Sequence, residues 1–232
     1  MPDFCFAPQP QPSVGIANST DRFPVRRIFC VGRNYAAHAR ELGNDDREPP
    51  FFFTKPADAV IDDCGPVPYP PLTNNLHHEI ELVVAVGEGG ANIAAGEAVK
   101  HVWGYGVGVD LTRRDLQDEA KKMARPWDWS KGFDNSAVCS ALIAADKAGN
   151  PDSGRIWLSV NGVERQSGDL ADMIWPVADI IAFCSQSMTL QKGDLIYTGT
   201  PAGVSELKVG DHVTGGVEGM GMIDFTVSGG AS

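Results

Sequence analysis

Two glutamates stand two residues apart at the start of a branched, apolar segment, and an aspartate ends a second such segment. Glu79 and Glu81 precede residues 82–86, and Asp110 follows residues 107–109. Alternate side chains of a strand point to the same face, so both glutamates would share one side. Carboxylates crowded on an apolar face repel each other unless a cation lies between them. The alternative is a solvent-facing edge strand that holds no metal ion.

The chemistry of these three side chains indicates which metal would bind. Carboxylate oxygens suit Mg²⁺ or Mn²⁺, whereas zinc prefers nitrogen and sulfur ligands. His77 and His78 directly precede Glu79. Their imidazoles could act as ligands, but we expect them to support the acidic residues or to bond the backbone.

A second pair of residues could activate water. His38 and Glu41 are three residues apart in a segment that predicts a short helix, so they share one helix face. A carboxylate that holds one imidazole nitrogen leaves the other nitrogen free to act as a base. The alternative is a surface ion pair, which stabilises a helix by only about 0.2–0.5 kcal/mol.

Other side chains could bind an anion. Lys131 lies among aromatic residues, where a desolvated amine could act as an acid or stabilise an oxyanion. Arg114 could hold a carboxylate through two hydrogen bonds, and Gln117 follows it on the same helix face. The hydroxyl and amide groups of residues 198–201, including Thr200, could bind an anion as well. Each has a structural alternative: a lysine that reaches to water, a surface arginine and an ordinary turn.

The composition argues against some classes of partner. The 232 residues carry a net charge of −11, which disfavours nucleic acid and anionic membranes as partners. No apolar segment approaches the roughly 20 residues that a membrane helix needs, and residues 1–12 do not resemble a signal peptide. Five cysteines without close paired spacing predict free thiols and a reducing, cytoplasmic location.

The pattern of strand-like runs and turns predicts an α+β, β-rich fold. We expect an extended N-terminal arm over residues 1–24 and a single catalytic domain over residues 25–232. Strands are predicted over residues 25–31, 51–54, 79–86, 102–111 and 140–145, in a hairpin around Asn161-Gly162, and in three runs within 194–227. Helices are predicted over residues 36–42, 94–100, 113–123 and 176–188. Thr112 is predicted to cap the third helix, whose apolar stripe comprises Leu116, Ala120 and Met123.

Taken in order, six segments resemble the fumarylacetoacetate hydrolase family, and the resemblance covers residues 28–227. A single one of these motifs is weak, but six in this order are specific. The segments are Val31-Gly32-Arg33-Asn34-Tyr35-Ala36-Ala37-His38-Ala39-Arg40-Glu41, Thr54-Lys55-Pro56, His77-His78-Glu79-Ile80-Glu81, residues 104–117, Lys131-Gly132-Phe133-Asp134 and Thr198-Gly199-Thr200-Pro201.

The resemblance implies a mixed β-sandwich roll of the type found in the C-terminal domain of that family, with a divalent metal at its centre and a homodimeric assembly. It implies His38 with Glu41 as a water-activating dyad on a lid, and Lys131 as a further catalytic group. The implied metal ligands are Glu79, Glu81 and Asp110, and the implied substrate contacts are Arg33, Lys55, Arg114, Gln117 and Thr200. One departure is Ser205, where relatives often have a glycine.

Such a site suits a 2-oxo acid that chelates Mg²⁺ or Mn²⁺ through its carboxylate and oxo oxygens. His38 would take a proton from a water that attacks the C4 carbonyl of a 2,4-dioxo acid. Cleavage of the C3–C4 bond would then yield pyruvate and a second acid. Small family members with these motifs resemble acylpyruvate hydrolases, and by analogy we expect fumarylpyruvate, an intermediate of bacterial gentisate catabolism, as substrate.

Three alternatives remain open at this stage. One is an oxaloacetate decarboxylase, and another is an isomerase or decarboxylase of a hydroxymuconate-type diacid, both of which work without a nucleophilic water. The third is a non-catalytic binding module in which a metal stabilises a β-sandwich. The pairing of His38 with Glu41 favours hydrolysis.

Overall fold

The computed structural model describes residues 4–35, 49–62, 65–149 and 151–230, and the structural statements below concern these residues. The strands are β1 (Ser13–Gly15), β2 (Arg22–Pro24), β3 (Arg27–Gly32), β4 (Phe51–Lys55), β5 (Val60–Asp62), β6 (Val67–Pro68), β7 (Leu76–His78), β8 (Ile80–Val86), β9 (Val102–Asp110), β10 (Thr112–Arg113), β11 (Ala137–Cys139), β12 (Ile143–Ala144), β13 (Arg155–Val160), β14 (Val163–Asp169), β15 (Asp194–Tyr197), β16 (Ser205–Leu207), β17 (His212–Val217) and β18 (Gly221–Ser228). The helices are α2 (Arg114–Lys122), α3 (Asp128–Lys131) and α4 (Val177–Ser187), with 3₁₀ helices η1 (Ala57–Ala59), η2 (Ala95–His101) and η3 (Leu170–Asp172).

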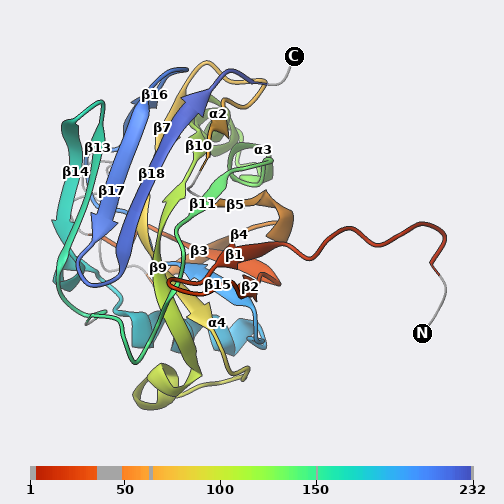
Figure 1. Cartoon of the computed structure of the whole chain (residues 1–232), viewed down its shortest axis with the longest axis vertical. Coiled ribbons are helices and arrows are strands. Elements are labelled where there is room, and N and C mark those ends of the chain that lie inside the picture. The colour runs from red at the N-terminus through yellow and green to blue at the C-terminus, as the bar shows by residue number, and fades with distance from the viewer. Residues whose placement is uncertain (1–3, 36–48, 63–64, 150, 231–232) are drawn as a thin grey trace.

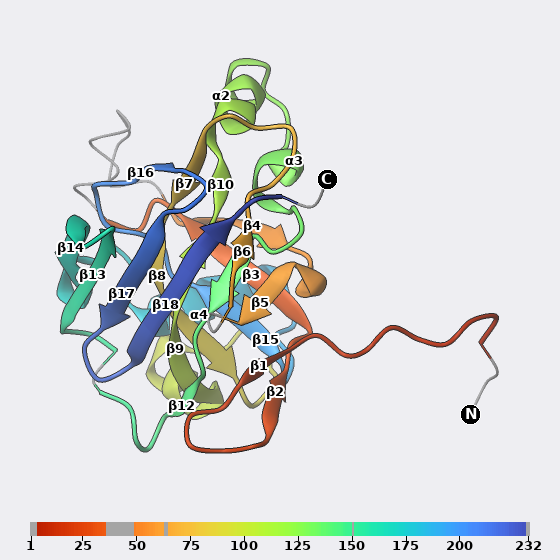
Figure 2. The same ribbon diagram turned by 45° about the horizontal axis from the view of Figure 1, so that its top comes forward.

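Two curved sheets form the body of the molecule, which confirms the predicted β-rich α+β roll. The larger sheet has the order β4-β3-β15-β8-β9-β11-β5, with β12 paired to β9. The second sheet, β14-β13-β17-β18-β6, forms the layer at the left of Figure 1. A small sheet, β10-β7-β16, continues toward α2 and α3, which lie at the opposite end of the body from α4 in that view. Figure 2 shows the molecule turned so that this end comes forward.

Alternation along the central strands β8 and β9 separates two hydrophobic clusters. Leu82 and Val84 of β8 pack into the cluster between the two sheets. Val83 and Ala85 point the other way, into a cluster with Leu195 and Tyr197 of β15. Glu79 and Glu81 are in phase with this second set, because side chains of a strand repeat every two residues. The pleat of β8 therefore explains why both carboxylates leave the sheet on one side.

Glycine in β9 makes room for an aromatic ring on that same side. A Cβ atom at Gly108 would lie 2.4 Å from Cε1 of Tyr197 and 2.6 Å from Cγ2 of Val83. The Tyr197 ring is fully buried there, and its hydroxyl donates to the carbonyl of Val138 at 2.9 Å. Gly108 therefore permits the close approach of the Tyr197 ring to this strand.

Two local predictions are confirmed. Strands β13 and β14 pair as a hairpin across Asn161 and Gly162, whose φ angles of 52° and 76° are those of a type I′ turn. Helix α4 begins directly after Pro176 and buries Val177, Ile180, Ile181 and Cys184, as its apolar pattern predicts.

Other predictions need correction. Thr112 does not cap the third helix, because it pairs with β7 in strand β10, and Arg113 occupies the N-cap position of α2. Within the strand predicted over residues 140–145 only Ile143 and Ala144 form a strand, β12, because the backbone of Leu142 bonds Gly15 and Ala17. The predicted helix at 94–100 is the 3₁₀ helix η2, and the predicted helix at 36–42 lies outside the described residues.

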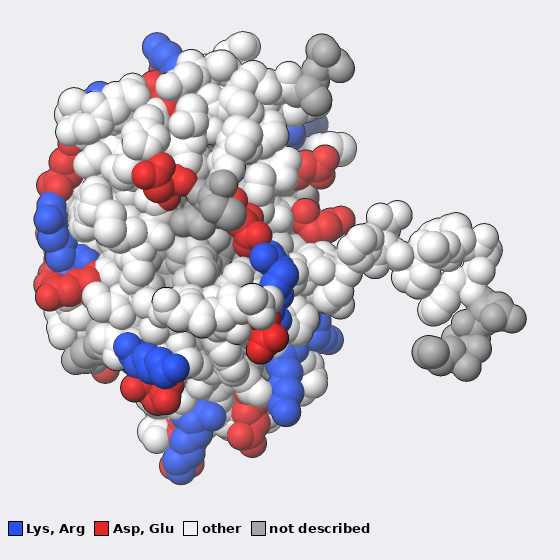
Figure 3. Space-filling view, viewed as in Figure 1, with Lys and Arg blue, Asp and Glu red and all other residues white. Residues whose placement is uncertain are grey.

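The segment predicted as an N-terminal arm contains paired structure. Residues 4–12 carry no strand or helix and extend away from the body in Figures 1 and 2. Residues 13–24 contain β1 and β2, which pair antiparallel and bury Val14 and Phe23. No helix among the described residues is long and apolar enough to cross a membrane. The face in Figure 3 shows acidic and basic side chains interspersed, with no broad basic surface.

We expect Gly108→Ala to destabilise the fold by about 1–3 kcal/mol, because a methyl group would overlap the buried Tyr197 ring. Gly96→Ala is the matched control, since a Cβ there meets nothing within 4 Å, and its effect should stay within about 0.5 kcal/mol. Urea unfolding followed by circular dichroism measures both. Equal urea midpoints for the two variants would show that the Tyr197 ring moves aside without loss of stability, and would contradict this prediction.

Candidate active site

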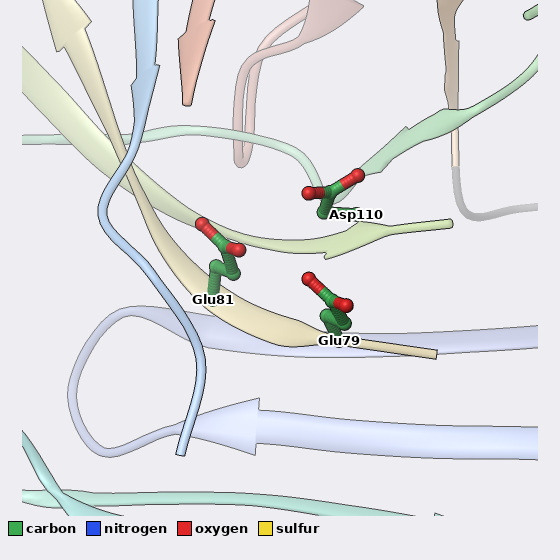
Figure 4. A group of neighbouring side chains, drawn as sticks. All are labelled: Glu79, Glu81 and Asp110. Carbon is green, nitrogen blue, oxygen red and sulfur yellow. The ribbon is translucent and has the colours of Figure 1, made fainter. Parts of the chain in front are cut away.

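Three carboxylates converge at the end of the β8–β9 pair. Glu79 lies between β7 and β8, Glu81 is the second residue of β8, and Asp110 is the last residue of β9. The Asp110 amide donates to the Glu79 carbonyl at 2.9 Å, which holds these two backbones together. One carboxylate oxygen from each residue lies within 4.8 Å of the others, and the side chains point toward one another in Figure 4. All three residues are buried.

This cluster fits a hard divalent cation. Burial, followed by the charges of Asp110 and Glu79, raises the pKa of Glu81 well above its usual value. Such a shift means that the site disfavours three negative charges unless positive charge balances them. The donor set consists of oxygens alone, and neither His77 nor His78 belongs to it. Mg²⁺ and Mn²⁺ therefore match the residues, as the sequence predicts.

Two buried lysines contact the cluster. Lys131 Nζ lies 2.8 Å from Glu79 Oε2 and 2.5 Å from Asp110 Oδ2, and it donates to the Thr112 hydroxyl at 2.6 Å. Burial alone would lower the pKa of Lys131, but Asp110 and Glu79 outweigh burial and raise it. Lys131 is therefore a firmly charged ammonium group that spans two of the carboxylates.

Lys55 approaches Asp110 from a different direction. Its Nζ lies 2.8 Å from Asp110 Oδ1 and also donates to the carbonyls of Leu111 and Lys131. Burial lowers the pKa of Lys55 despite the neighbouring Asp110. Lys55 is not among the residues that line the cavity, so its contacts position Asp110.

The polar face of α2 completes the cluster. Arg114 forms an ion pair with Glu79 Oε1 and donates to Gln117 Oε1 at 2.5 Å. Arg114 and Gln117 are buried on α2, whereas Leu116 is only partly buried and Met123 is exposed. The apolar stripe predicted from this helix is therefore not its most buried face, because the polar face lines a cavity.

His77 supports Arg114 and does not face the carboxylates as a ligand. Its Nδ1 accepts from Arg114 Nε at 3.4 Å, and its Nε2 lies 2.9 Å from Asn75 Oδ1. Burial and then Arg114 lower the pKa of His77 to about 4. The imidazole is therefore neutral near pH 7, which allows it to accept a hydrogen bond from a guanidinium group.

The loop of residues 198–201 binds the third carboxylate. The Gly199 amide donates to Glu81 Oε2 at 2.7 Å. Gly199 has a φ of 95°, and a Cβ there would lie 2.6 Å from Asn34 Cβ, so only glycine fits. Asn34 is fully buried and donates to the carbonyls of Thr198 and Trp175. Asn34 is one of the residues that the sequence analysis did not assign a role.

A cavity of about 410 Å³ opens onto the cluster. Its lining includes most of the site residues predicted from the sequence, namely Arg33, Glu79, Glu81, Arg114, Gln117, Lys131 and Thr200. Lys121 and Trp127, which were not predicted, also line it. We call the part formed by the exposed Lys121 and the half-buried Arg33 and Trp127 the outer cavity. The predicted dyad of His38 and Glu41 lies outside the described residues.

Gln166 was also missed, and His78, which was expected to support the acidic residues or to bond the backbone, bonds this side chain. His78 Nδ1 lies 2.8 Å from Gln166 Oε1, and Gln166 in turn contacts the Thr200 hydroxyl. Gln166 is 88 residues from His78 along the chain, and no spacing rule connects a glutamine in a predicted hairpin to a remote loop. A polar residue at a position that should face the core was the available signal.

Most of this chain matches one protein family and is similar to proteins of known activity. The model of the fumarylacetoacetate (FAA) hydrolase C-terminal domain matches residues 27–228. The mitochondrial oxaloacetate tautomerase FAHD1 of Bos taurus is 41% identical over 202 residues, which are 87% of this chain and 91% of that protein. The oxaloacetate tautomerase YcgM of Escherichia coli is 42% identical over 193 residues, which cover 83% and 88% of the two chains.

Solved structures extend the comparison. Fumarylpyruvate hydrolase from Pseudomonas aeruginosa, solved with Mn²⁺ and pyruvate, is 46% identical with a TM-score of 0.94, covering 97% of this chain and 99% of that one. A protein from Burkholderia cenocepacia, provisionally named a fumarylpyruvate hydrolase, is 61% identical with a TM-score of 0.93, covering 100% and 97%.

We expect metal binding to release a proton from Glu81. The raised pKa means that the metal-free site keeps a proton there over a wider pH range, and a dication must displace it. Affinity for Mn²⁺ should therefore increase with pH, by up to about tenfold per unit below that pKa. Calorimetry in two buffers of different ionisation enthalpy counts the released protons.

Glu81→Gln should abolish this release and weaken binding, whereas the exposed Glu164→Gln should change neither. Proton release that is unchanged in Glu81→Gln would contradict the assignment.

Proposed function

The chain belongs to the fumarylacetoacetate hydrolase family, and we propose that it is a metal-dependent hydrolase that splits 2,4-dioxo acids, with fumarylpyruvate as substrate. The supporting observation is a buried cluster of three carboxylates that fits a divalent metal and opens onto a cavity lined by cationic side chains. The products would be fumarate and pyruvate. The homodimer and the cytoplasmic location stay predictions from the resemblance and the cysteine content.

The charge balance favours a substrate with two negative charges. Lys55, Lys131 and Arg114 form ion pairs with Glu79 and Asp110, whereas Glu81 accepts a hydrogen bond from the Gly199 amide and would ionise when a metal binds. A bound Mg²⁺ or Mn²⁺ would leave this buried site with two excess positive charges, which an anionic ligand must neutralise. Fumarylpyruvate carries a carboxylate at each end and meets this requirement.

The outer cavity offers cations for the second carboxylate. Arg33 lies over the Phe51 ring at 5.2 Å, and Lys121 lies over the Trp127 ring at 5.7 Å. Burial and then Arg114 lower the pKa of Lys121, since its amine shares the cavity with another cation. A carboxylate between these groups would relieve that repulsion. This arrangement supports an elongated diacid that extends from the carboxylate cluster to the outer cavity.

The metal ion would supply a Lewis acid for the 2-oxo acid end of the substrate. Arg114, held by Glu79 and Gln117, would orient the adjacent carboxylate, with Thr200 beside it. His38 with Glu41 would take a proton from the water that attacks C4. The C3–C4 bond then breaks with its electron pair on C3, and the charged Lys131 or a water would return a proton there.

A second candidate is tautomerisation or decarboxylation of oxaloacetate, which the names of the FAHD1 and YcgM relatives favour. Both reactions use the same grip on a 2-oxo acid and proton movement at C3. Neither needs an attacking water, so the role of His38 distinguishes them from hydrolysis. Oxaloacetate is also shorter than fumarylpyruvate, so the two candidates differ in the length of diacid that the cavity would hold.

We expect the Mn²⁺-loaded protein to convert fumarylpyruvate to equimolar fumarate and pyruvate. His38→Ala should lower kcat by about 100-fold or more, because the general base is lost. The exposed His212→Ala is the control and should keep full activity. Loss of the enol absorbance and coupled pyruvate detection provide the assay. Rapid turnover of oxaloacetate with none of fumarylpyruvate would favour the second candidate.

We expect Lys121→Met to raise KM for fumarylpyruvate by about tenfold, because one partner of the outer carboxylate is lost. Acetylpyruvate, which has no second carboxylate, should show nearly the same KM in the variant and the parent. Lys122→Met removes a charge from the neighbouring exposed position and is the matched control. An equal rise in KM for fumarylpyruvate and acetylpyruvate would show that Lys121 does not bind the second carboxylate.

A further inference from the structure

We propose that Gln166 is a positioning residue that makes the Thr200 hydroxyl a hydrogen-bond donor toward the oxygen atoms of the bound 2-oxo acid. The inference rests on the proposed function, since it names the group that Thr200 contacts. It follows from a hydrogen-bonded series of four side chains, the half-buried Ser205 and the buried His78, Gln166 and Thr200, in which two backbone groups fix the orientation of Gln166.

The orientation of the Gln166 carboxamide is determined by two backbone groups. Its Oε1 accepts the Ile80 amide at 3.1 Å, and its Nε2 donates to the Pro201 carbonyl at 2.8 Å. A backbone amide only donates and a carbonyl only accepts, so the oxygen and nitrogen of Gln166 cannot be exchanged. The side chain is 1% exposed, and water therefore does not compete for these contacts.

The same amide nitrogen fixes the role of Thr200. Gln166 Nε2 lies 2.8 Å from Thr200 Oγ1, so the hydroxyl oxygen accepts this bond. Its own proton must point elsewhere, and within the described part of the chain no protein atom receives it. Thr200 lines the cavity beside the carboxylate cluster. The free proton is therefore available to an anionic oxygen of a ligand.

The imidazole of His78, on the other side of Gln166 from Thr200, prevents the Gln166 carboxamide from rotating. His78 Nδ1 lies 2.8 Å from Gln166 Oε1 and must carry a proton there, because an amide oxygen only accepts. His78 Nε2 lies 2.8 Å from the hydroxyl of Ser205, which pairs with His78 across β7 and β16. The direction at Gln166 is the same whether the imidazole is neutral or charged. Ser205, where relatives often have a glycine, therefore has a role, because its hydroxyl bonds His78.

The loop that carries Thr200 also holds a carboxylate of the cluster. The Gly199 amide donates to Glu81, and Thr200 follows directly. One loop therefore presents an amide to a candidate metal ligand and a hydroxyl to the cavity. A ligand carboxylate beside the metal would lie next to this hydroxyl. Because Gln166 donates to the hydroxyl oxygen, the ligand carboxylate would meet the hydroxyl proton and not a lone pair.

A double-mutant cycle with Gln166→Glu and Thr200→Val tests the inference. An ionised glutamate at 166 keeps the shape of the side chain but would accept the Thr200 proton. The readout is calorimetric binding of oxalate, a non-reactive mimic of a 2-oxo acid, to the Mn²⁺-loaded protein, together with KM and kcat. The exposed Gln186→Glu on α4 is the matched control.

We expect each single variant to bind oxalate about tenfold more weakly, and the double variant to bind no worse than Thr200→Val alone. Gln186→Glu should bind as the parent does. Additive losses in the double variant, or unchanged binding in Gln166→Glu, would overturn the inference. A parent protein that binds Mn²⁺ but not oxalate would instead refute the proposed function.

Thr200→Ser and Thr200→Val keep the test valid if Gln166→Glu does not fold. Serine retains the donor hydroxyl and should bind oxalate within about twofold of the parent, whereas valine should lose about tenfold. Equal binding by the two variants would show that the hydroxyl proton is not used.

Discussion

Mutual repulsion among three buried carboxylates is the constraint around which this molecule is organised. Glu79, Glu81 and Asp110 lie within 4.8 Å of one another, with side chains removed from water. Burial of charge without compensation is costly, so each carboxylate has a partner on a different element. Arg114 and Lys131 come from α2 and α3, Lys55 ends β4, and the Gly199 amide belongs to the loop after β15. The elements around the cavity therefore meet where each supplies a cation or a hydrogen-bond donor to a carboxylate.

The sequence predicts the local chemistry better than the arrangement of the elements. Two-residue spacing placed Glu79 and Glu81 on one face, and the turn signal Asn161-Gly162 located a hairpin, because both depend on backbone geometry over a few residues. The motif order identified the family and hence the rolled β-sandwich. The roles of Asn34 and Gln166 depend on contacts with Thr198, Trp175 and Thr200 across more than 30 residues, which no local pattern encodes.

Helix α2 shows why pattern alone misjudges a site element. An apolar stripe usually marks the buried side of a helix, since burial of apolar surface drives folding. In α2 the buried residues include Arg114 and Gln117, because the helix covers a polar cavity and its charged side chain pairs with Glu79. Thr112 was mistaken for a helix cap because the sequence does not show that it lies in the charged cluster. Its hydroxyl accepts from Lys131, so a residue type that favours helix ends is used inside the charged cluster.

Glu81 and Asp110 belong to one antiparallel pair of neighbouring strands and Glu79 directly precedes that pair, whereas the cavity also needs segments as distant as Arg33 and Thr200. Contacts between close segments lose less chain entropy on closure and tend to form early. Bringing the carboxylates together therefore requires closure of a short stretch of chain, whereas completing the cavity wall requires closure over more than 160 residues between Arg33 and Thr200, roughly an order of magnitude longer than the connection between the two strands.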